Sequence, residues 1–494
     1  MTKTPAFISN YLPSFNVNNP LATRLGRAIS PATSEHPGLS GIHPLSDSLD
    51  AFAARYLLCG MAEKTLDVQY YIWQDDMSGR LLFSALLAAA DRGVRVRLLL
   101  DDNNTNGLDD ILELLNAHQQ IEVRLFNPFS FRLFRAIGYL TDFARLNRRM
   151  HNKTFTVDGE VTIIGGRNVG DAYFGVGKQP LFSDLDVLAI GPVVGEVSQD
   201  FERYWSSQCV STLDKVLNVD PDVLQQRVQL PDDWRSDPMA RRYLDRLTTS
   251  QFATNLVARS LDMYWAKTRM LSDDPRKGQG KARNHTLLPQ RLMNVIGIPE
   301  REIDIISAYF VPTRAGIAQI LGLVRKGVKI AILTNSLAAN DVAVVHAGYA
   351  RWRKKLLRHG VELYELKPEQ DGPRRPRDRG LTGNSGSSLH AKTFSVDKQK
   401  VFIGSFNFDP RSAMLNTEMG FVIESAALAQ DIHQRFTQSQ KEAAWALRLD
   451  HWGRVNWVEN SDGKEIVWKK EPYTRFWQRV LVRLVYRLPI EWLL

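Results

Sequence analysis

Two histidines and two lysines stand in a short pattern that occurs twice in this chain. Residues 151–168 read HNKTFTVDGEVTIIGGRN, and residues 390–407 read HAKTFSVDKQKVFIGSFN. Aligned without a gap, the copies share five chemically informative positions: His151/His390, Lys153/Lys392, Asp158/Asp397, Gly165/Gly404 and Asn168/Asn407. One imidazole can attack phosphorus while the other protonates the leaving oxygen. The repeat therefore indicates one site that holds a phosphate between two halves.

The lysines and asparagines of the pattern supply charge and hydrogen bonds for a phosphate. We expect Lys153 and Lys392 to neutralise its oxygens, assisted by the side-chain amides of Asn168 and Asn407. This chemistry needs no metal ion, and we expect no cofactor.

The copies differ at two neighbouring positions, where Gly166 aligns with Ser405 and Arg167 with Phe406. We expect the Ser405 hydroxyl to donate a hydrogen bond to a phosphate oxygen, and we place it in the substrate-binding set. Arg167 is expected to form only surface ion pairs.

A catalytic histidine also needs an acid that orients its ring. Asp184 and Glu418 follow the two signatures at comparable distances. We assign Asp184 to His151 and Glu418 to His390, with Asp186 as the rival of Asp184.

Each copy predicts a β-hairpin. Thr154–Val157 and 161–164 are β-rich runs on either side of an Asp-Gly turn, and 393–396 and 401–403 match them. Because strand side chains alternate, His and Lys two residues apart face the same way. Asp158 and Asp397 belong to the signature and enter the catalytic set with it. Their place at the turn, far from the phosphate, favours a structural role.

The repeat extends upstream of the hairpins. Residues 66–68 and 303–305 match, as do 92–100 and 326–334, with a helical stretch before each of the latter. Each half thus alternates strands and helices before its hairpin. This order predicts an α/β sandwich with a mostly parallel sheet.

At these residues the chain resembles the phospholipase D superfamily, whose hallmark is a doubled H-x-K-x4-D signature. The stretches LDVQYYIWQDDMSGR, GSFNFDPRSAMLNTE and LPIEWLL resemble the bacterial cardiolipin synthases, closest to the C type. The resemblance covers the chain from about Leu49 onward. It implies two pseudo-twofold-related α-β-α domains with the active site at their interface.

The resemblance also implies a reaction. His151 would form a covalent phosphohistidine, and His390 would protonate the leaving alcohol and then deprotonate the acceptor. The product would be cardiolipin, made from phosphatidylglycerol and a second phospholipid, phosphatidylethanolamine. The alternative is a phosphodiester hydrolase acting on phospholipid or nucleic acid. We expect no nucleic-acid partner, and the sequence identifies no protein partner.

Composition and segment boundaries limit the kinds of partner, the membrane topology and the domain organisation that we expect. The 494 residues carry a net charge of +9, which suits anionic partners such as lipid, and only two cysteines. The sequence contains no run of eighteen apolar residues, so it predicts no membrane-spanning helix. We divide the chain into a flexible leader (1–45), a first domain (46–210), a connector (211–300), a second domain (301–445) and a C-terminal segment (446–494).

Two segments are candidates for membrane contact. The C-terminus predicts a basic amphipathic helix in which Phe476 and Trp477 flank arginines spaced four apart: Arg475, Arg479, Arg483 and Arg487. The alternative is a terminal helix docked on its own protein. Residues 128–149 mix Phe with Arg and predict either a second docking element or a core helix. We expect a peripheral enzyme on the cytoplasmic face of the bacterial inner membrane.

Overall fold

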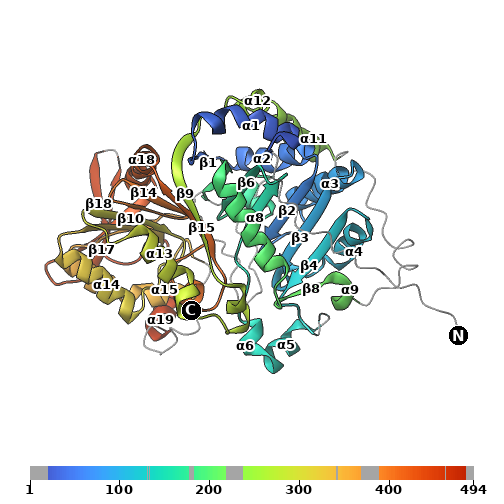
Figure 1. Cartoon of the computed structure of the whole chain (residues 1–494). Coiled ribbons are helices and arrows are strands. Elements are labelled where there is room, and N and C mark those ends of the chain that lie inside the picture. Colours follow the sequence, from blue (N-terminus) through green and yellow to red (C-terminus); the bar gives the residue numbers. More distant parts are fainter. Residues whose placement is uncertain are drawn as a thin grey trace.

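The computed structural model describes residues 20–130, 132, 134–176, 183–217, 237–340, 343–368, 389–461 and 463–485. Two α/β halves lie side by side, the N-terminal one in blue to green and the C-terminal one in yellow to red (Figure 1). Inner strands such as Arg95–Asp101 (β3) are buried almost throughout, as expected of strands covered on both faces.

The first half contains a sheet of antiparallel and parallel strands. Its strands in spatial order are β8 (Val210–Thr212), β4 (Ile121–Phe126), β3, β2 (Thr65–Tyr70), β5 (Thr154–Val157), β6 (Val161–Gly165), β7 (Asp186–Ile190) and β1 (Ser40–Leu45). Its principal helices are α2 (Ser48–Met61), α3 (Met77–Asp91), α4 (Asp109–Ala117) and α8 (Pro192–Trp205). Shorter helices are α5 (Arg135–Thr141), α6 (Phe143–Leu146), α7 (Asp171–Phe174) and α9 (Leu213–Val216).

The second half repeats this plan. Its strands in spatial order are β18 (Lys464–Trp468), β17 (Val455–Ser461), β16 (Ala444–Leu449), β12 (Glu362–Leu366), β11 (Lys329–Asn335), β10 (Glu302–Ser307), β13 (Lys392–Val396), β14 (Lys400–Gly404) and β15 (Met419–Glu424). Its helices are α13 (Leu288–Ile296), α14 (Arg314–Arg325), α15 (Ala343–Ala350), α16 (Arg353–Arg358), α17 (Pro410–Met414), α18 (Ala426–Glu442) and α19 (Phe476–Val485).

The predicted α/β class, the alternation and both signature hairpins are confirmed, but the prediction of mostly parallel sheets is wrong. Only β2–β3–β4 and β10–β11–β12 pair in parallel among the described strands. The hairpins and the strands that follow them add antiparallel partners, so both sheets are mixed.

Two boundaries also differ from the prediction. Residues 24–45 are not a flexible leader, because α1 (Arg24–Glu35) covers the first half and β1 pairs with β7. Within the predicted connector, helices α11 (Pro238–Thr248) and α12 (Gln251–Ala258) pack beside α2. Its strand β9 (Tyr264–Ser272) pairs with β1 at one end and with β15 at the other. The connector therefore joins the two sheets.

A shared apolar core holds the halves together. Each half has its own core, and a third cluster takes residues from both halves. That cluster unites Ile164 and Val187 of the first half with Ile403 and Phe421 of the second. The sheet ends that carry the two signatures are thereby brought to a common interface.

Candidate active site

The backbone beside each catalytic histidine is hydrogen-bonded to the other half. The His151 amide donates to the Thr417 carbonyl at 2.9 Å, and the His390 amide donates to the Ser183 carbonyl at 2.8 Å. Both rings are nearly buried, with 8% and 6% of their residues' surfaces exposed. The two signatures thus meet at one interface, in a pseudo-twofold arrangement.

The orienting acids are exchanged between the halves. His151 Nδ1 lies 2.9 Å from Glu418 Oε2, and His390 Nδ1 lies 2.5 Å from Asp184 Oδ2. The predicted acids are therefore beside the histidines, but the predicted pairing of each acid with its own half is wrong. Because Nδ1 of each ring faces a carboxyl group, Nε2 is the nitrogen directed away from it.

Ser405 belongs to the support of Glu418. Its hydroxyl donates to Glu418 Oε2 at 2.5 Å and accepts from the Met419 amide at 3.0 Å. The side chain is fully buried. The predicted hydrogen bond from Ser405 to a phosphate is thus wrong, since this hydroxyl fixes the acid of His151.

Arg167 plays the matching part behind Asp184. It is fully buried, and its guanidinium donates to the carbonyls of Asp184 and Leu45 at 2.8 and 2.7 Å. The expectation of surface ion pairs is wrong. The rival acid, Asp186, is paired with Arg55 at 2.7 Å and is not a partner of either histidine.

The copies therefore differ because their acids differ in length. At Gly166, a Cβ atom would lie 2.2 Å from Asp184 Oδ1, so only glycine admits this carboxylate. The aligned Ser405 faces the longer Glu418 and can hydrogen-bond with it.

Each signature lysine folds back on its own histidine. Lys153 Nζ donates to the His151 carbonyl at 2.7 Å, and Lys392 Nζ donates to the His390 carbonyl. Both lysines are buried, and burial lowers the pKa of Lys153 to about 7. A protonated lysine has three N–H donors, so in that form each lysine places positive charge beside its ring and keeps donors for a ligand.

Burial and the lysine charges lower the pKa of both histidines. For His151 burial comes first, followed by Lys153 and Lys392, and the pKa falls well below its usual value. Burial likewise lowers the pKa of His390 to about 3, with contributions from Lys392 and Lys153. Each ring feels the lysine of the other half, so the two signatures form one electrostatic site. Both imidazoles are neutral near neutral pH.

The two acids have opposite tendencies. Burial raises the pKa of the Glu418 carboxyl to about 7. Burial also acts on Asp184, but contact with His390 and the charges of Lys392 and Arg167 outweigh it and hold the pKa below its usual value. The halves are thus similar in geometry and different in protonation.

Two tyrosines that the sequence did not single out pack edge-on against the histidines. Tyr71 lies 5.0 Å from His151 and Tyr173 lies 5.3 Å from His390, between ring centroids. Asn168 donates to the Tyr173 hydroxyl at 3.0 Å, and Asn407 is also buried nearby in the second signature. In the sequence, the only sign that Tyr173 belongs to the site was its position five residues after Asn168. Phosphate binding by the asparagines stays a prediction.

The signature aspartates stabilise the fold. Asp158 and Asp397 have φ of +53° and +54°, in the left-handed region that Asp tolerates at turns. The Asp158 carboxylate accepts from the amides of Glu63, Lys64 and Thr65, and that of Asp397 accepts from residues 300–302. Each ties its hairpin to the start of the first parallel strand, seven residues from the histidine. Counting them as catalytic was wrong.

In the described part of 128–149, the core-helix prediction is wrong. Phe134, just before α5, is exposed, as are Ile137, Leu140 and Phe143 of α5 and α6. Arg411 donates to Asn147 Oδ1 at 2.9 Å, which ties the end of this segment to the second half next to the signatures. The docking alternative stays a prediction.

The C-terminal helix is confirmed over Phe476–Val485, the alternative of docking on its own protein is confirmed for one face, and membrane contact stays a prediction. Val482 is buried against Leu337 and Ala347, so one face docks on the protein. Phe476 and Trp477 are 61% and 74% exposed on another face. Arg475 precedes the helix, Arg479 and Arg483 lie within it, and Arg487 is outside the described residues. Within the described ranges, no helix is both long and apolar enough to span a bilayer.

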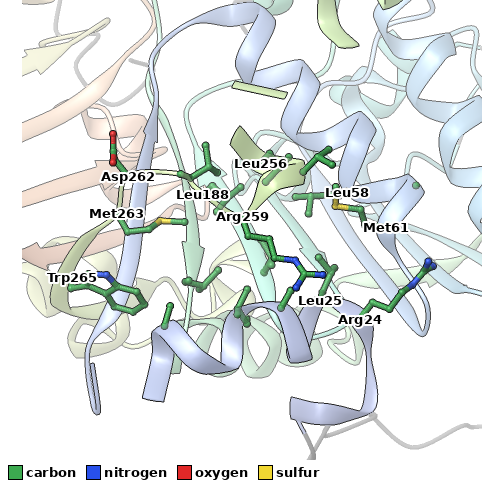
Figure 2. A pocket seen from close by; sticks show the side chains of 18 residues that line it. Arg24, Leu25, Leu58, Met61, Leu188, Leu256, Arg259, Asp262, Met263 and Trp265 are labelled. Carbon is green, nitrogen blue, oxygen red and sulfur yellow. The ribbon is translucent and has the colours of Figure 1, made fainter. Parts of the chain in front are cut away.

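A cavity of about 450 Å³ is bordered by α1, α2, α12, strands β6 and β7, and residues 259–265 (Figure 2). Its lining is mainly apolar, with Leu25, Leu58, Leu188 and Met263, and Arg24 and Arg259 also border it. Val161 of the first signature hairpin borders it, but none of the signature histidines, lysines, aspartates or asparagines does. This cavity is therefore separate from the histidine site.

Comparisons with known proteins agree with this geometry. A family model described as "Cardiolipin synthase, PLD-like domain" matches residues 58–205 and 292–440. Cardiolipin synthase C of Escherichia coli (strain K12) is 69% identical over 95% of this chain and 100% of its own length. Cardiolipin synthase A of Pseudomonas syringae pv. syringae is 27% identical over 78% of this chain and 66% of its own.

A solved structure shows a related fold. The crystal structure of phosphatidylserine synthase from Haemophilus influenzae Rd KW20 superposes with a TM-score of 0.54. It is 14% identical in sequence and covers 85% of this chain and 92% of its own. The two-half architecture is thus shared with a protein of distant sequence.

Proposed function

The chain belongs to the cardiolipin synthase family of the phospholipase D superfamily, and from this premise we propose that it is a phosphatidyltransferase that makes cardiolipin. The observation that carries the proposal is the shared site. Each histidine contacts an acid of the opposite half, and the charges of both lysines lower the pKa of both histidines. Such a site suits one phosphodiester held between two imidazoles.

In the first step, Nε2 of His151 attacks the phosphorus of the donor lipid. A nitrogen–phosphorus bond forms, and the bond from phosphorus to the headgroup oxygen breaks. His390 delivers a proton to that oxygen, and the headgroup alcohol leaves. A bound phosphate anion raises the pKa of His390, since its charge opposes those of Lys153 and Lys392. Substrate binding thereby prepares the acid.

In the second step, His390 takes a proton from the hydroxyl of the acceptor lipid. The acceptor oxygen attacks phosphorus, the bond to His151 breaks, and the free imidazole is restored. Glu418 supports the ring of His151 throughout, and Asp184 supports the ring of His390 as its charge changes. Lys153 and Lys392 stabilise the negative charge that develops on the phosphate oxygens.

The balance of atoms assigns the lipids their places. Cardiolipin carries two phosphatidyl groups on one glycerol, so the acceptor must bring that glycerol with a hydroxyl group. Phosphatidylglycerol does so. Phosphatidylethanolamine ends in an amine, so as second substrate it serves as the phosphatidyl donor and releases ethanolamine.

The enzyme works as a peripheral protein on the cytoplasmic face of the inner membrane, on an anionic surface. The exposed apolar side chains of α5, α6 and α19 support this placement, as does the excess of positive charge. Membrane contact by Arg475, Arg479 and Arg483 would add electrostatic attraction to burial of Phe476 and Trp477.

The test is turnover of two labelled lipids by the purified full-length chain. Phosphatidylglycerol carries its label in the headgroup glycerol, and phosphatidylethanolamine carries a different label in ethanolamine. We expect glycerol label in cardiolipin and ethanolamine label in water, with no product from His151→Ala or His390→Ala. Phosphatidic acid as the main product would replace the transferase with a hydrolase. Normal turnover by either variant would overturn the two-histidine mechanism.

A further inference from the structure

A basic hollow of about 640 Å³ lies in the second half, away from the histidine site. It is bordered by α15, α16, β17, the segment after β18, and α19. Eight cationic side chains and one carboxylate, Glu471, line it. None of the signature residues is among the lining residues. Such an excess of one charge in a concave site suits an anionic ligand.

The single carboxylate does not neutralise this hollow. Glu471 accepts a hydrogen bond from Arg353 at 2.6 Å and lies 3.1 Å from the Nε2 of His346. Its negative charge is therefore paired with these two buried side chains. Lys354, Lys469 and Lys470 are exposed and form no ion pair within the part of the chain that is described. Their charges remain available to a ligand.

Helix α19 separates this hollow from an exposed apolar face. Its inner residue Val482 lines the hollow and packs toward α15, which lies beside it (Figure 1). Arg479 and Arg483 also line the hollow. Four outward side chains are 48–74% exposed: Phe476, Trp477, Leu481 and Leu484. A helix with this arrangement can lie in a membrane surface, with its apolar face at acyl-chain depth and its cations among headgroups.

We propose that this hollow binds the phosphate headgroup of an anionic phospholipid while the lipid stays in the membrane. The inference rests on the proposed membrane contact. It gives the enzyme a second lipid-binding site, distinct from the site where the phosphatidyl group is transferred. The neighbouring apolar face favours a membrane lipid over a free phosphate, because that face can sit at acyl-chain depth in the same membrane that supplies the headgroup. The enzyme would then be held where its anionic substrate and product accumulate.

The test compares two matched variants of the full-length chain in vesicle sedimentation. Lys469→Gln/Lys470→Gln removes two charges from the hollow, and Arg242→Gln/Arg246→Gln removes two exposed charges from α11, on the first half (Figure 1). The vesicles are phosphatidylcholine with or without phosphatidylglycerol. We expect the first variant to bind anionic vesicles about tenfold more weakly and the second to bind nearly as the parent does. Equal losses would show general surface attraction and overturn the site.

Two further measurements separate the possible outcomes. Inorganic phosphate should not displace the parent protein from anionic vesicles beyond the effect of a chloride salt of equal ionic strength. Specific displacement would mean a free-phosphate site and overturn the lipid assignment. Turnover in detergent micelles should be the same in both variants and the parent. Loss of turnover in the parent itself would count against the proposed reaction, and unequal turnover among the three would overturn the separation of the two sites.

Discussion

His151 and His390 each contact a carboxyl group from the opposite half, and this exchange changes what a substitution at either acid should do. Glu418 follows the second signature in sequence but supports the first. Asp184 follows the first signature but supports the second. Each acid is held by a hydrogen bond of its own: Ser405 donates to the Glu418 carboxyl group, and Arg167 donates to the Asp184 backbone carbonyl.

Glu418→Gln and Asp184→Asn should each lower turnover on the order of 10³-fold, since each leaves one ring without its orienting carboxyl group. In imidazole NMR spectra, Glu418→Gln should shift the signals of His151, and Asp184→Asn should shift those of His390. The reverse pattern would restore the pairing within each half. His151→Ala and His390→Ala identify the two sets of signals.

The stability of the protein should fall in acid because of His390. Its pKa is about 3 in the folded state, where burial and Lys392 lower it, against about 6.5 in the unfolded chain. Between these values the unfolded state binds more protons, so the free energy of unfolding falls as pH falls, by at most about 1.4 kcal/mol per pH unit from this group. His390→Asn should flatten that dependence.

Urea unfolding of the parent and of His390→Asn, from about pH 7 to about pH 4, measures this difference. The two curves should converge toward the acid end. Parallel curves over the whole interval would mean that His390 titrates normally in the folded protein.

At the scale of elements, the signature hairpins are held by their aspartates. Asp158 is fully buried and accepts hydrogen bonds from backbone amides at the start of β2. Asp397 is partly exposed and accepts the matching hydrogen bonds at the start of β10. These bonds close the sheet at the end away from the histidines.

Asp158→Ala should lower the free energy of unfolding by about 2–3 kcal/mol, because three backbone amides lose a fully buried charged acceptor. Asp397→Ala should cost less, because water can replace the carboxylate. Denaturant titration gives both values, and turnover per folded molecule should stay near that of the parent. A variant with normal stability and no turnover would return these residues to the catalytic set.

Local patterns predicted some elements and missed others for physical reasons. The hairpins were predictable because β-rich runs flank a turn residue that tolerates positive φ. Strand β1 was not, because Ser, Gly and Pro in Ser40–Leu45 disfavour a strand and only pairing with β7 and β9 makes it one. The exchange of acids was also invisible, since sequence distance favours the partner in the same half.

At the scale of the whole molecule, two similar halves share one core and one site. The repeat in the sequence predicted both halves, and the resemblance to the phospholipase D superfamily implied that they meet at the active site. It could not predict that β9 links the two sheets, nor that the sheets are mixed, because both depend on pairing between distant segments. The differences between the copies, Gly166 against Ser405, became interpretable only with both acids in place.

Chelating agents should leave turnover unchanged. Lys153 and Lys392 supply the positive charge that the phosphate needs, and the two histidines supply the nucleophile and the proton. Assay in excess EDTA, after dialysis against it, measures this. Loss of activity that a divalent cation restores would contradict a site built from these side chains alone.

The exchanged acids also constrain how this gene can change. A crossover near the midpoint of the coding sequence joins His151 to a foreign Glu418, and Asp184 to a foreign His390, in a single event. A chimaera of two relatives can then have two well-folded halves and still be inactive, unless both parents position these four residues alike. Selection should therefore preserve the match between these residues of the two halves, so that the halves evolve together.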